Sequence, residues 1–256
     1  MIPFFSLFGR TVGSYGVCAV LGLLVCGFWA VKLGRQHGIP SYVILQALVA
    51  AGVGLLLGGH LLYGLLHLSE LFSPPALTLS ALSRGFGGSV YYGGLLGAWL
   101  GVAWYARRFV PMEQDRLVDC FALFTPLFHA FGRVGCFLGG CCYGIPCRFG
   151  ITVTENPLIP EVNDIARFPV QLLEAGCELA LFFFLLWLFY SQRQAGRLIF
   201  CYLAPYALLR FGLEFLRGDI ARGVWLGIST SQWLSIPLFL FALWRFVKKN
   251  TPVVPS

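Results

Sequence analysis

Long apolar runs separated by short polar segments dominate the hydrophobic pattern of this chain. A helix that spans a membrane needs about 20 consecutive, mostly apolar residues. Seven stretches meet that requirement, so we predict an all-α, polytopic integral membrane protein with seven transmembrane helices. The predicted spans cover residues 12–31, 42–66, 87–106, 117–139, 171–190, 198–216 and 229–247.

The composition supports a membrane protein and excludes a soluble one. Of the 256 residues, 58% are hydrophobic and 11% are charged, whereas soluble domains carry about 25% charged residues. The stronger basic flank of the first run, Lys32 and Arg35, follows it, so we interpret this run as a retained span rather than a signal peptide. Because no internal repeat or soluble domain is found, we expect residues 1–256 to form a single transmembrane domain.

The net charge of +7 is best explained by membrane topology. The basic residues occur singly or in small groups between apolar spans, so we expect no nucleic-acid partner. Groups that follow the first, third, fifth and seventh spans fall on one side, which we assign to the cytoplasm. The N-terminus is then outside and the C-terminus cytoplasmic. These groups are Lys32 and Arg35; Arg107, Arg108 and Arg116; Arg193 and Arg197; and Arg245, Lys248 and Lys249.

One arginine, Arg133, lies near the end of the fourth apolar run. A charged side chain at the centre of a membrane helix costs about 2.5–3.5 kcal/mol on insertion scales. We therefore expect an anion to meet this guanidinium group.

The sixth span carries Arg210, Glu214 and Arg217 at helical spacing, which predicts that they share one face. These charges either neutralise one another in a purely structural ladder, or Glu214 holds the arginines in the fork geometry that suits phosphate. Together with Arg133, the second interpretation predicts a site for a phospholipid head group near the outer leaflet.

The fifth span begins with a polar first turn. Pro169 is typical of that position, and it places Gln171 and Glu174 one turn into the membrane. Glu174 is either an ion-pair partner of Arg167 or Arg133, or a residue with a direct role in the chemistry.

Two further groups favour packing roles. Gly93, Gly97 and Gly101 are four residues apart in the third span, a spacing that lets helices approach closely. His60 and His129 are each isolated in their spans, and we expect both to be packing residues.

Four cysteines lie in or after the end of the fourth span, at Cys136, Cys141, Cys142 and Cys147. Structural zinc sites favour a two-residue gap between paired ligands, so this spacing is a weak metal signal and we assign no metal. Inert thiols, a disulfide on the outer face and a reactive thiolate beside Arg133 all stay open.

Taken in order, these segments resemble the bacterial prolipoprotein diacylglyceryl transferase family, and the resemblance covers most of the chain. The matching motifs are Tyr15-Gly16, Gly58-Gly-His-Leu-Leu-Tyr63, Tyr92-Gly-Gly94, Gly132-Arg-Val-Gly-Cys-Phe-Leu-Gly-Gly-Cys-Cys-Tyr-Gly144, Arg167-Phe-Pro-Val-Gln-Leu-Leu-Glu174, Arg210-Phe-Gly-Leu-Glu-Phe-Leu-Arg217 and Ser231-Gln-Trp-Leu-Ser-Ile-Pro237.

The resemblance implies a transferase of the bacterial inner membrane. Such an enzyme moves the diacylglyceryl group of phosphatidylglycerol to the thiol of a lipobox cysteine in a secreted precursor, and glycerol phosphate leaves. The implied partners are phosphatidylglycerol, the precursor and the surrounding membrane lipids, and the implied reaction needs no metal or redox cofactor.

The resemblance also implies roles for individual residues. Arg133 and Arg210 would hold the phosphate and stabilise charge on the leaving group, while Glu174 and Tyr92 are the candidate proton acceptors. The implied substrate-binding residues are Tyr15, Gly93, Gly94, Cys136, Gly144, Gln171, Glu214 and Arg217.

Four positions depart from the family pattern. Cys136 and Cys141 stand where the family has Asn and Glu, and Tyr92 and Phe168 each stand where it has His. Two alternatives therefore stay open: a divergent paralogue with another acceptor, and a non-enzymatic phospholipid-binding or thiol-redox membrane protein.

Overall fold

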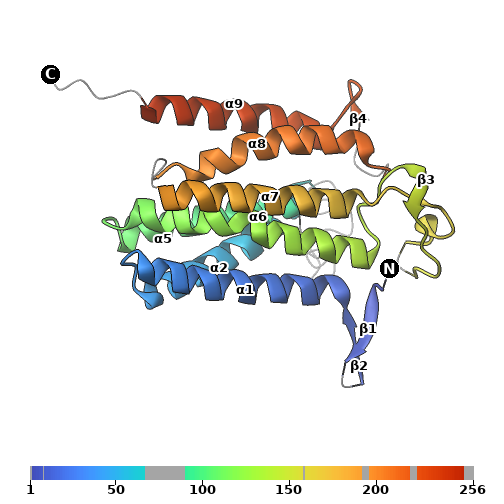
Figure 1. The fold of residues 1–256 in the computed structure, drawn as a ribbon, viewed down its shortest axis with the longest axis horizontal. Helices are drawn as coiled ribbons and strands as arrows, with labels where there is room; N and C mark the ends of the chain where they lie inside the picture. The colour runs from blue at the N-terminus through green and yellow to red at the C-terminus, as the bar shows by residue number, and fades with distance from the viewer. Residues whose placement is uncertain are drawn as a thin grey trace, which may run out of the picture. The chain divides into compact units, whose positions relative to one another are not determined.

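The computed structural model describes residues 2–7, 9–66, 90–157, 159–191, 196–219 and 224–250. It is mostly helical, and an α-helix overlaps each of the seven predicted spans (Figure 1). The helices of this part of the chain are α1 (Ser14–Gln36), α2 (Ser41–Leu66), α5 (Tyr91–Phe109), α6 (Gln114–Gly139), α7 (Val170–Ser191), α8 (Leu198–Leu213) and α9 (Thr230–Asn250).

Among the described residues, five of these helices are long and apolar enough to cross a membrane: α1, α2, α6, α7 and α8 together with the turn that extends it to Leu216. The other two, α5 and α9, both carry basic residues near their C-terminal ends. Many helices also expose large apolar side chains, among them Leu24, Phe183 and Leu240. A helix surface of this kind is suited to lipid rather than water.

Two compact units make up the chain. Unit 1 comprises Met1–Phe28 and Phe121–Ser256, and unit 2 comprises Trp29–Cys120.

Helices α2 and α5 of unit 2 pack backbone against backbone. A Cβ atom added to Gly97 would lie 2.0 Å from the carbonyl oxygen of Gly54, and one added to Gly93 would lie 2.3 Å from that of Gly58. No side chain fits at either distance, so the glycine spacing serves close helix approach, as predicted.

Unit 1 holds α7, α8 and α9, the short strands, and the parts of α1 and α6 up to Phe28 and from Phe121. An antiparallel hairpin of β1 (Phe4–Leu7) and β2 (Arg10–Gly13) leads into α1. Helix α8 packs against α7 and α9. The other short elements are β3 (Pro146–Ile151), the 3-10 turns η1 (Pro160–Val162) and η2 (Glu214–Leu216), and the strand pair β4 (Val224–Trp225) and β5 (Ile228–Ser229).

A capping box fixes the start of α9. The amide nitrogen of Gln232 donates to the Ser229 hydroxyl at 3.2 Å, and the amide nitrogen of Ser229 donates to the Gln232 side chain at 3.0 Å. This reciprocal pattern satisfies two amides at the helix start. The capping box also orients the first turn of α9. Ser231 lies in this turn and contacts Arg210 of the site described below.

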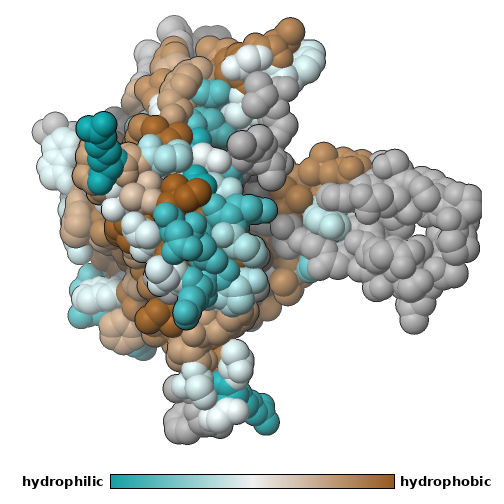
Figure 2. Space-filling model, turned by 90° about the vertical axis from the view of Figure 1, so that its right-hand side faces the viewer, coloured by the Kyte–Doolittle hydropathy of each residue, from teal (hydrophilic) through white to brown (hydrophobic). Residues whose placement is uncertain are grey.

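Hydrophilic residues gather at the end of unit 1 that carries β3, with hydrophobic surface on the neighbouring helices (Figure 2). The segment between α6 and α7 forms this end, and it is the polar, proline-bearing stretch of the sequence. The charged groups of the candidate site lie on helices that end or begin here.

We expect Gly97→Ala to lower the free energy of unfolding by about 1–3 kcal/mol, because the added methyl group overpacks the contact with Gly54. Thermal unfolding in detergent micelles measures the change. Gly52→Ala is the matched control, since Gly52 lies on α2 with open space around its Cα. Equal stability of the two variants would contradict the close α2–α5 contact.

Candidate functional site

A row of buried charges joins α6 to α7. His129 and Arg133 are one helical turn apart on α6, and Glu174 and Glu178 are one turn apart on α7. Arg133 Nη2 lies 2.6 Å from Glu174 Oε2, and His129 Nδ1 lies 2.9 Å from Glu178 Oε1. His129 Nε2 is 3.8 Å from Glu174 Oε1, which links the two pairs.

All four side chains are buried: Arg133 is 7% exposed, and Glu174 is 1% exposed. Of the two partners considered for Glu174, Arg133 is therefore the one that it contacts. A buried charge is tolerated when it is paired, because pairing offsets part of the desolvation cost.

His129, predicted to be a satisfied packing histidine, is buried and contacts two carboxylates. Glu178 was missed altogether. The matching four-residue spacings on α6 and α7 were present in the sequence, but only the packing of the two helices shows that they face each other.

Arg210, on α8, is held by two partners. Its Nη2 atom lies 2.5 Å from Glu214 Oε2 and donates to the Ser231 hydroxyl at 2.9 Å. The predicted Arg210–Glu214 pair is thus confirmed. Arg210 is 4% exposed, so its guanidinium group is fixed in a buried position by groups from both ends of the α8–α9 connection.

The prediction that Arg217 shares one helix face with Arg210 and Glu214 is wrong. Helix α8 ends at Leu213 and continues as the tighter turn η2, which takes Arg217 off the face of Arg210 and Glu214. Arg217 instead donates from Nε and Nη2 to the two carboxylate oxygens of Asp219, at 3.0 and 2.9 Å. Burial works to lower the pKa of Arg217, but the hydrogen bonds to Asp219 and the negative charges of Asp219 and Cys142 together raise the pKa, so the side chain stays charged.

Gly144 lies where three chain segments meet. It forms a β-bridge with Arg217, and a Cβ atom on it would lie 2.2 Å from the carbonyl oxygen of Phe168 and 3.0 Å from that of Leu216. Only glycine fits this crossing. The loop after α6 is in this way tied to the start of α7 and to the end of α8.

Two polar side chains hold the same loop from the α7 side. Gln171 Nε2 donates to the carbonyl oxygen of Cys141 at 2.8 Å. Arg167 lies over the Tyr143 ring, 4.4 Å from its centroid, and donates to the carbonyl oxygens of Gly144 and Glu161. These contacts fix the backbone of the loop beside Arg133.

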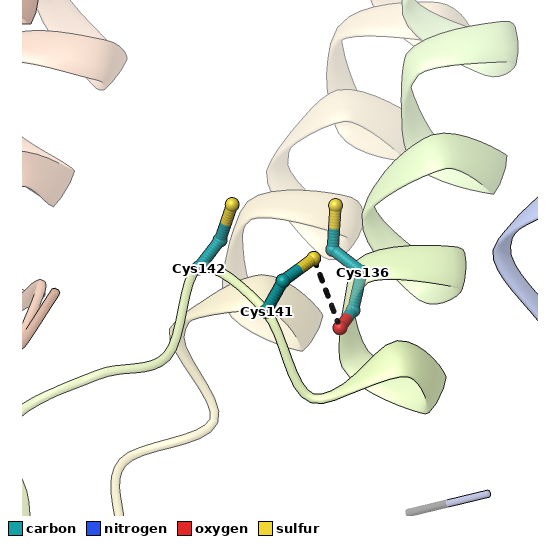
Figure 3. Close-up of side chains that lie close together, drawn as sticks. All are labelled: Cys136, Cys141 and Cys142. Atoms are coloured by element: carbon teal, nitrogen blue, oxygen red, sulfur yellow. Dashed lines mark hydrogen bonds between the residues drawn. The ribbon is translucent and has the colours of Figure 1, made fainter. Parts of the chain in front are cut away.

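Three of the cysteines converge at the end of α6 (Figure 3). The Sγ atoms of Cys136, Cys141 and Cys142 all lie within 4.8 Å of one another. Arg133 Nη1 donates to Cys136 Sγ at 3.9 Å, and Cys141 Sγ donates to the carbonyl oxygen of Cys136 at 3.7 Å. We refer to these three residues as the thiol cluster.

Cys142 adopts a left-handed backbone conformation, with φ at 57°, which is uncommon for a residue with a side chain. Hydrogen bonds from Cys136 and Cys141 lower the pKa of the Cys142 thiol, and the positive charges of Arg217 and Arg133 add to that shift.

The structure places the other predicted site residues in different surroundings. Tyr15, in the first turn of α1, contacts Gly135 of α6, in unit 1. Gly93 and Gly94 belong to the α2–α5 contact of unit 2. Tyr92 lies in the first turn of α5, and its side chain is outside the part of the chain that the structure describes.

Buried guanidinium groups beside hydroxyl, amide and thiol groups can bind an oxyanion such as a phosphate ester. The carboxylates fix the planes of the guanidinium groups, and burial keeps water from screening the positive charges.

Comparisons with known proteins agree with this chemistry. A family model described as prolipoprotein diacylglyceryl transferase matches residues 3–248. A phosphatidylglycerol–prolipoprotein diacylglyceryl transferase of Clostridium tetani is 32% identical over 96% of this chain and 98% of its own length. Proteins of the same name from Clostridium perfringens and Legionella pneumophila are each 31% identical, over 90% and 96% of this chain and 88% and 96% of their own lengths.

We expect Glu174→Gln to lower the free energy of unfolding by about 3–5 kcal/mol, because it leaves the buried Arg133 charge without its partner. Chemical or thermal unfolding in detergent measures the loss. Glu161→Gln, the same substitution at an exposed position of η1, is the control and should change stability little. If both variants unfold alike, the Arg133–Glu174 pair does not carry the stability assigned to it.

Proposed function

Because the chain belongs to the prolipoprotein diacylglyceryl transferase family, we propose that it transfers a diacylglyceryl group from phosphatidylglycerol to the lipobox cysteine of a secreted precursor. Glycerol phosphate is the leaving product. The observation that carries the proposal is the pair of buried arginines, Arg133 and Arg210, each held in place by a carboxylate.

Arg133 suits a phosphodiester because it retains capacity for an anionic oxygen. The Nε atom of Arg133 is buried and has no hydrogen-bond partner among the residues that the structure describes. Arg210 contributes a second buried positive charge, held by Glu214 and Ser231. A carboxylate holds each guanidinium group, Glu174 on α7 for Arg133 and Glu214 one turn on for Arg210, so little side-chain entropy is lost when the lipid binds.

In the proposed reaction, the thiolate of the precursor attacks the glycerol carbon that carries the phosphate ester. A carbon–sulfur bond forms, the carbon–oxygen bond breaks, and the electron pair leaves with the phosphate oxygen. Arg133 and Arg210 stabilise the charge that develops on this oxygen, which is electrostatic catalysis in a site of low dielectric constant.

The precursor thiol must also lose its proton. We propose Tyr92 as the acceptor, supported by its position in the family motif. Glu174 was the other candidate. Because its carboxylate contacts both Arg133 and His129, we assign it the task of orienting Arg133.

The remaining predicted residues have proposed roles around the lipid. Gly144 and Gln171 fix the loop after α6, and Glu214 orients Arg210. Arg217 adds a positive charge near Cys142. Tyr15, Gly93, Gly94 and Cys136 are proposed to contact the substrate on the strength of the family motif alone.

We further propose that all seven helices span the inner membrane of a bacterium, within a single domain of residues 1–256. The N-terminus and the polar end that carries β3 then lie outside, and the C-terminus lies in the cytoplasm. The distribution of lysine and arginine between the connecting segments supports this orientation.

We expect Arg133→Ala and Arg210→Ala each to slow lipid transfer by at least about 100-fold, because each removes a donor to the developing phosphate charge. The assay follows radiolabelled phosphatidylglycerol into a lipobox protein, in vesicles and in a bacterium depleted of its own transferase. Arg148→Ala, at an exposed position of β3, is the control and should transfer at the wild-type rate. If Arg133→Ala transfers lipid at the wild-type rate, the proposed binding of the phosphate by Arg133 and Arg210 is contradicted.

A further inference from the structure

Apart from the substrate contact proposed for Cys136, the transfer gives the thiol cluster no role, yet its three sulfur atoms converge from the last turn of α6 and the loop that follows it. Cys136 lies in the last turn of α6, and Cys141 and Cys142 lie in the loop that follows (Figure 3). The loop folds back because the amide nitrogen of Cys141 donates to the carbonyl oxygen of Cys136 at 3.1 Å. Gln171 holds the same residue from α7.

The spacing of the sulfur atoms suits a common metal ligand sphere. Zinc–sulfur bonds are about 2.3 Å long, so the sulfurs of a three-thiolate site lie about 4 Å apart. In the structure all three sulfurs are within 4.8 Å of one another. The three sulfurs are therefore close to the separation that one ion requires.

The charges around the cluster also suit a thiolate-bound cation. Three thiolates with a divalent ion carry one net negative charge, and Cys136 is buried while Cys141 and Cys142 are partly exposed. Arg133 donates to Cys136 Sγ at 3.9 Å, and Arg217 places a second positive charge near Cys142. These guanidinium groups offset the negative charge of the complex, in the way that hydrogen bonds to metal-bound sulfur commonly do.

We propose that Cys136, Cys141 and Cys142 form a three-thiolate site for a soft, thiophilic cation of the Zn²⁺ class. Soft sulfur ligands select such ions over Mg²⁺ and Ca²⁺. Binding forms three metal–sulfur bonds and releases the three thiol protons to the solvent. The bound ion fixes the loop between α6 and β3.

A disulfide between two of the three residues is the competing use of the same sulfurs. It would join one pair and leave the third thiol outside. The convergence of three sulfurs on one point, with positive charge on two sides, favours the metal.

The test is a titration of the purified, reduced, full-length protein in detergent with Cd²⁺, a spectroscopic probe for thiolate ligation. We expect a sulfur-to-cadmium charge-transfer band that saturates at one Cd²⁺ per chain, and competition by Zn²⁺ but not by Mg²⁺. Cys142→Ser and Cys141→Ser should each lose the band. Cys147→Ser is the matched control and should keep it, since Cys147 lies on β3 outside the cluster.

Thermal unfolding of each variant without metal checks that it is folded. Wild-type protein should also gain thermal stability on adding Zn²⁺, and Cys142→Ser should not. The proposal is overturned if no saturable band forms, if Cys142→Ser and Cys147→Ser bind alike, or if peptide mapping of protein alkylated in intact cells finds a disulfide within the cluster. These readouts do not involve lipid transfer, so they stand apart from the proposed function.

Discussion

The ion pair between Arg133 and Glu174 is the constraint on which the rest of the site depends. A guanidinium group this deeply buried is costly unless a carboxylate meets it, and Glu174 does so at 2.6 Å. The pair fixes how α6 and α7 face each other. His129 and Glu178 extend the same contact by one helical turn.

The consequences reach the loop that follows α6. With α6 and α7 fixed, Gln171 is placed to hold the backbone at Cys141, and Gly144 is placed to cross the start of α7 and the end of α8. Arg210, near the end of α8, is held in a similar way by Glu214, one helical turn further along the chain. It also donates a hydrogen bond to Ser231 in the first turn of α9. In each case the arginine lies on a helix, and a carboxylate fixes the direction of its guanidinium group.

Much of this arrangement could be predicted from the sequence, because its determinants are local. Apolar runs long enough to span a membrane predicted where the seven helices lie. The four-residue spacing of Arg210 and Glu214 predicted their pair, and the spacing of Gly93 and Gly97 predicted a close helix contact.

The features that the sequence did not predict depend on tertiary packing. Nothing in the apolar pattern near Leu213 marks the change from α-helix to 3-10 turn that turns Arg217 toward Asp219. The pairing of His129 with Glu178 requires knowing which faces of α6 and α7 meet. The convergence of the thiols depends on how the loop after α6 folds back onto that helix, and a spacing of cysteines cannot reveal it.

The central claim is that the buried charges are there to bind a lipid phosphate and not only to hold the helices together. The most direct measurement uses the double variant Arg133→Met, Glu174→Leu, in which both charges are removed together. Replacing a buried ion pair by apolar residues of similar size is often neutral or stabilising, so this protein should remain folded by thermal unfolding. Lipid transfer by it should be lost. A folded double variant that still lipidates a lipobox protein at the wild-type rate would contradict the account.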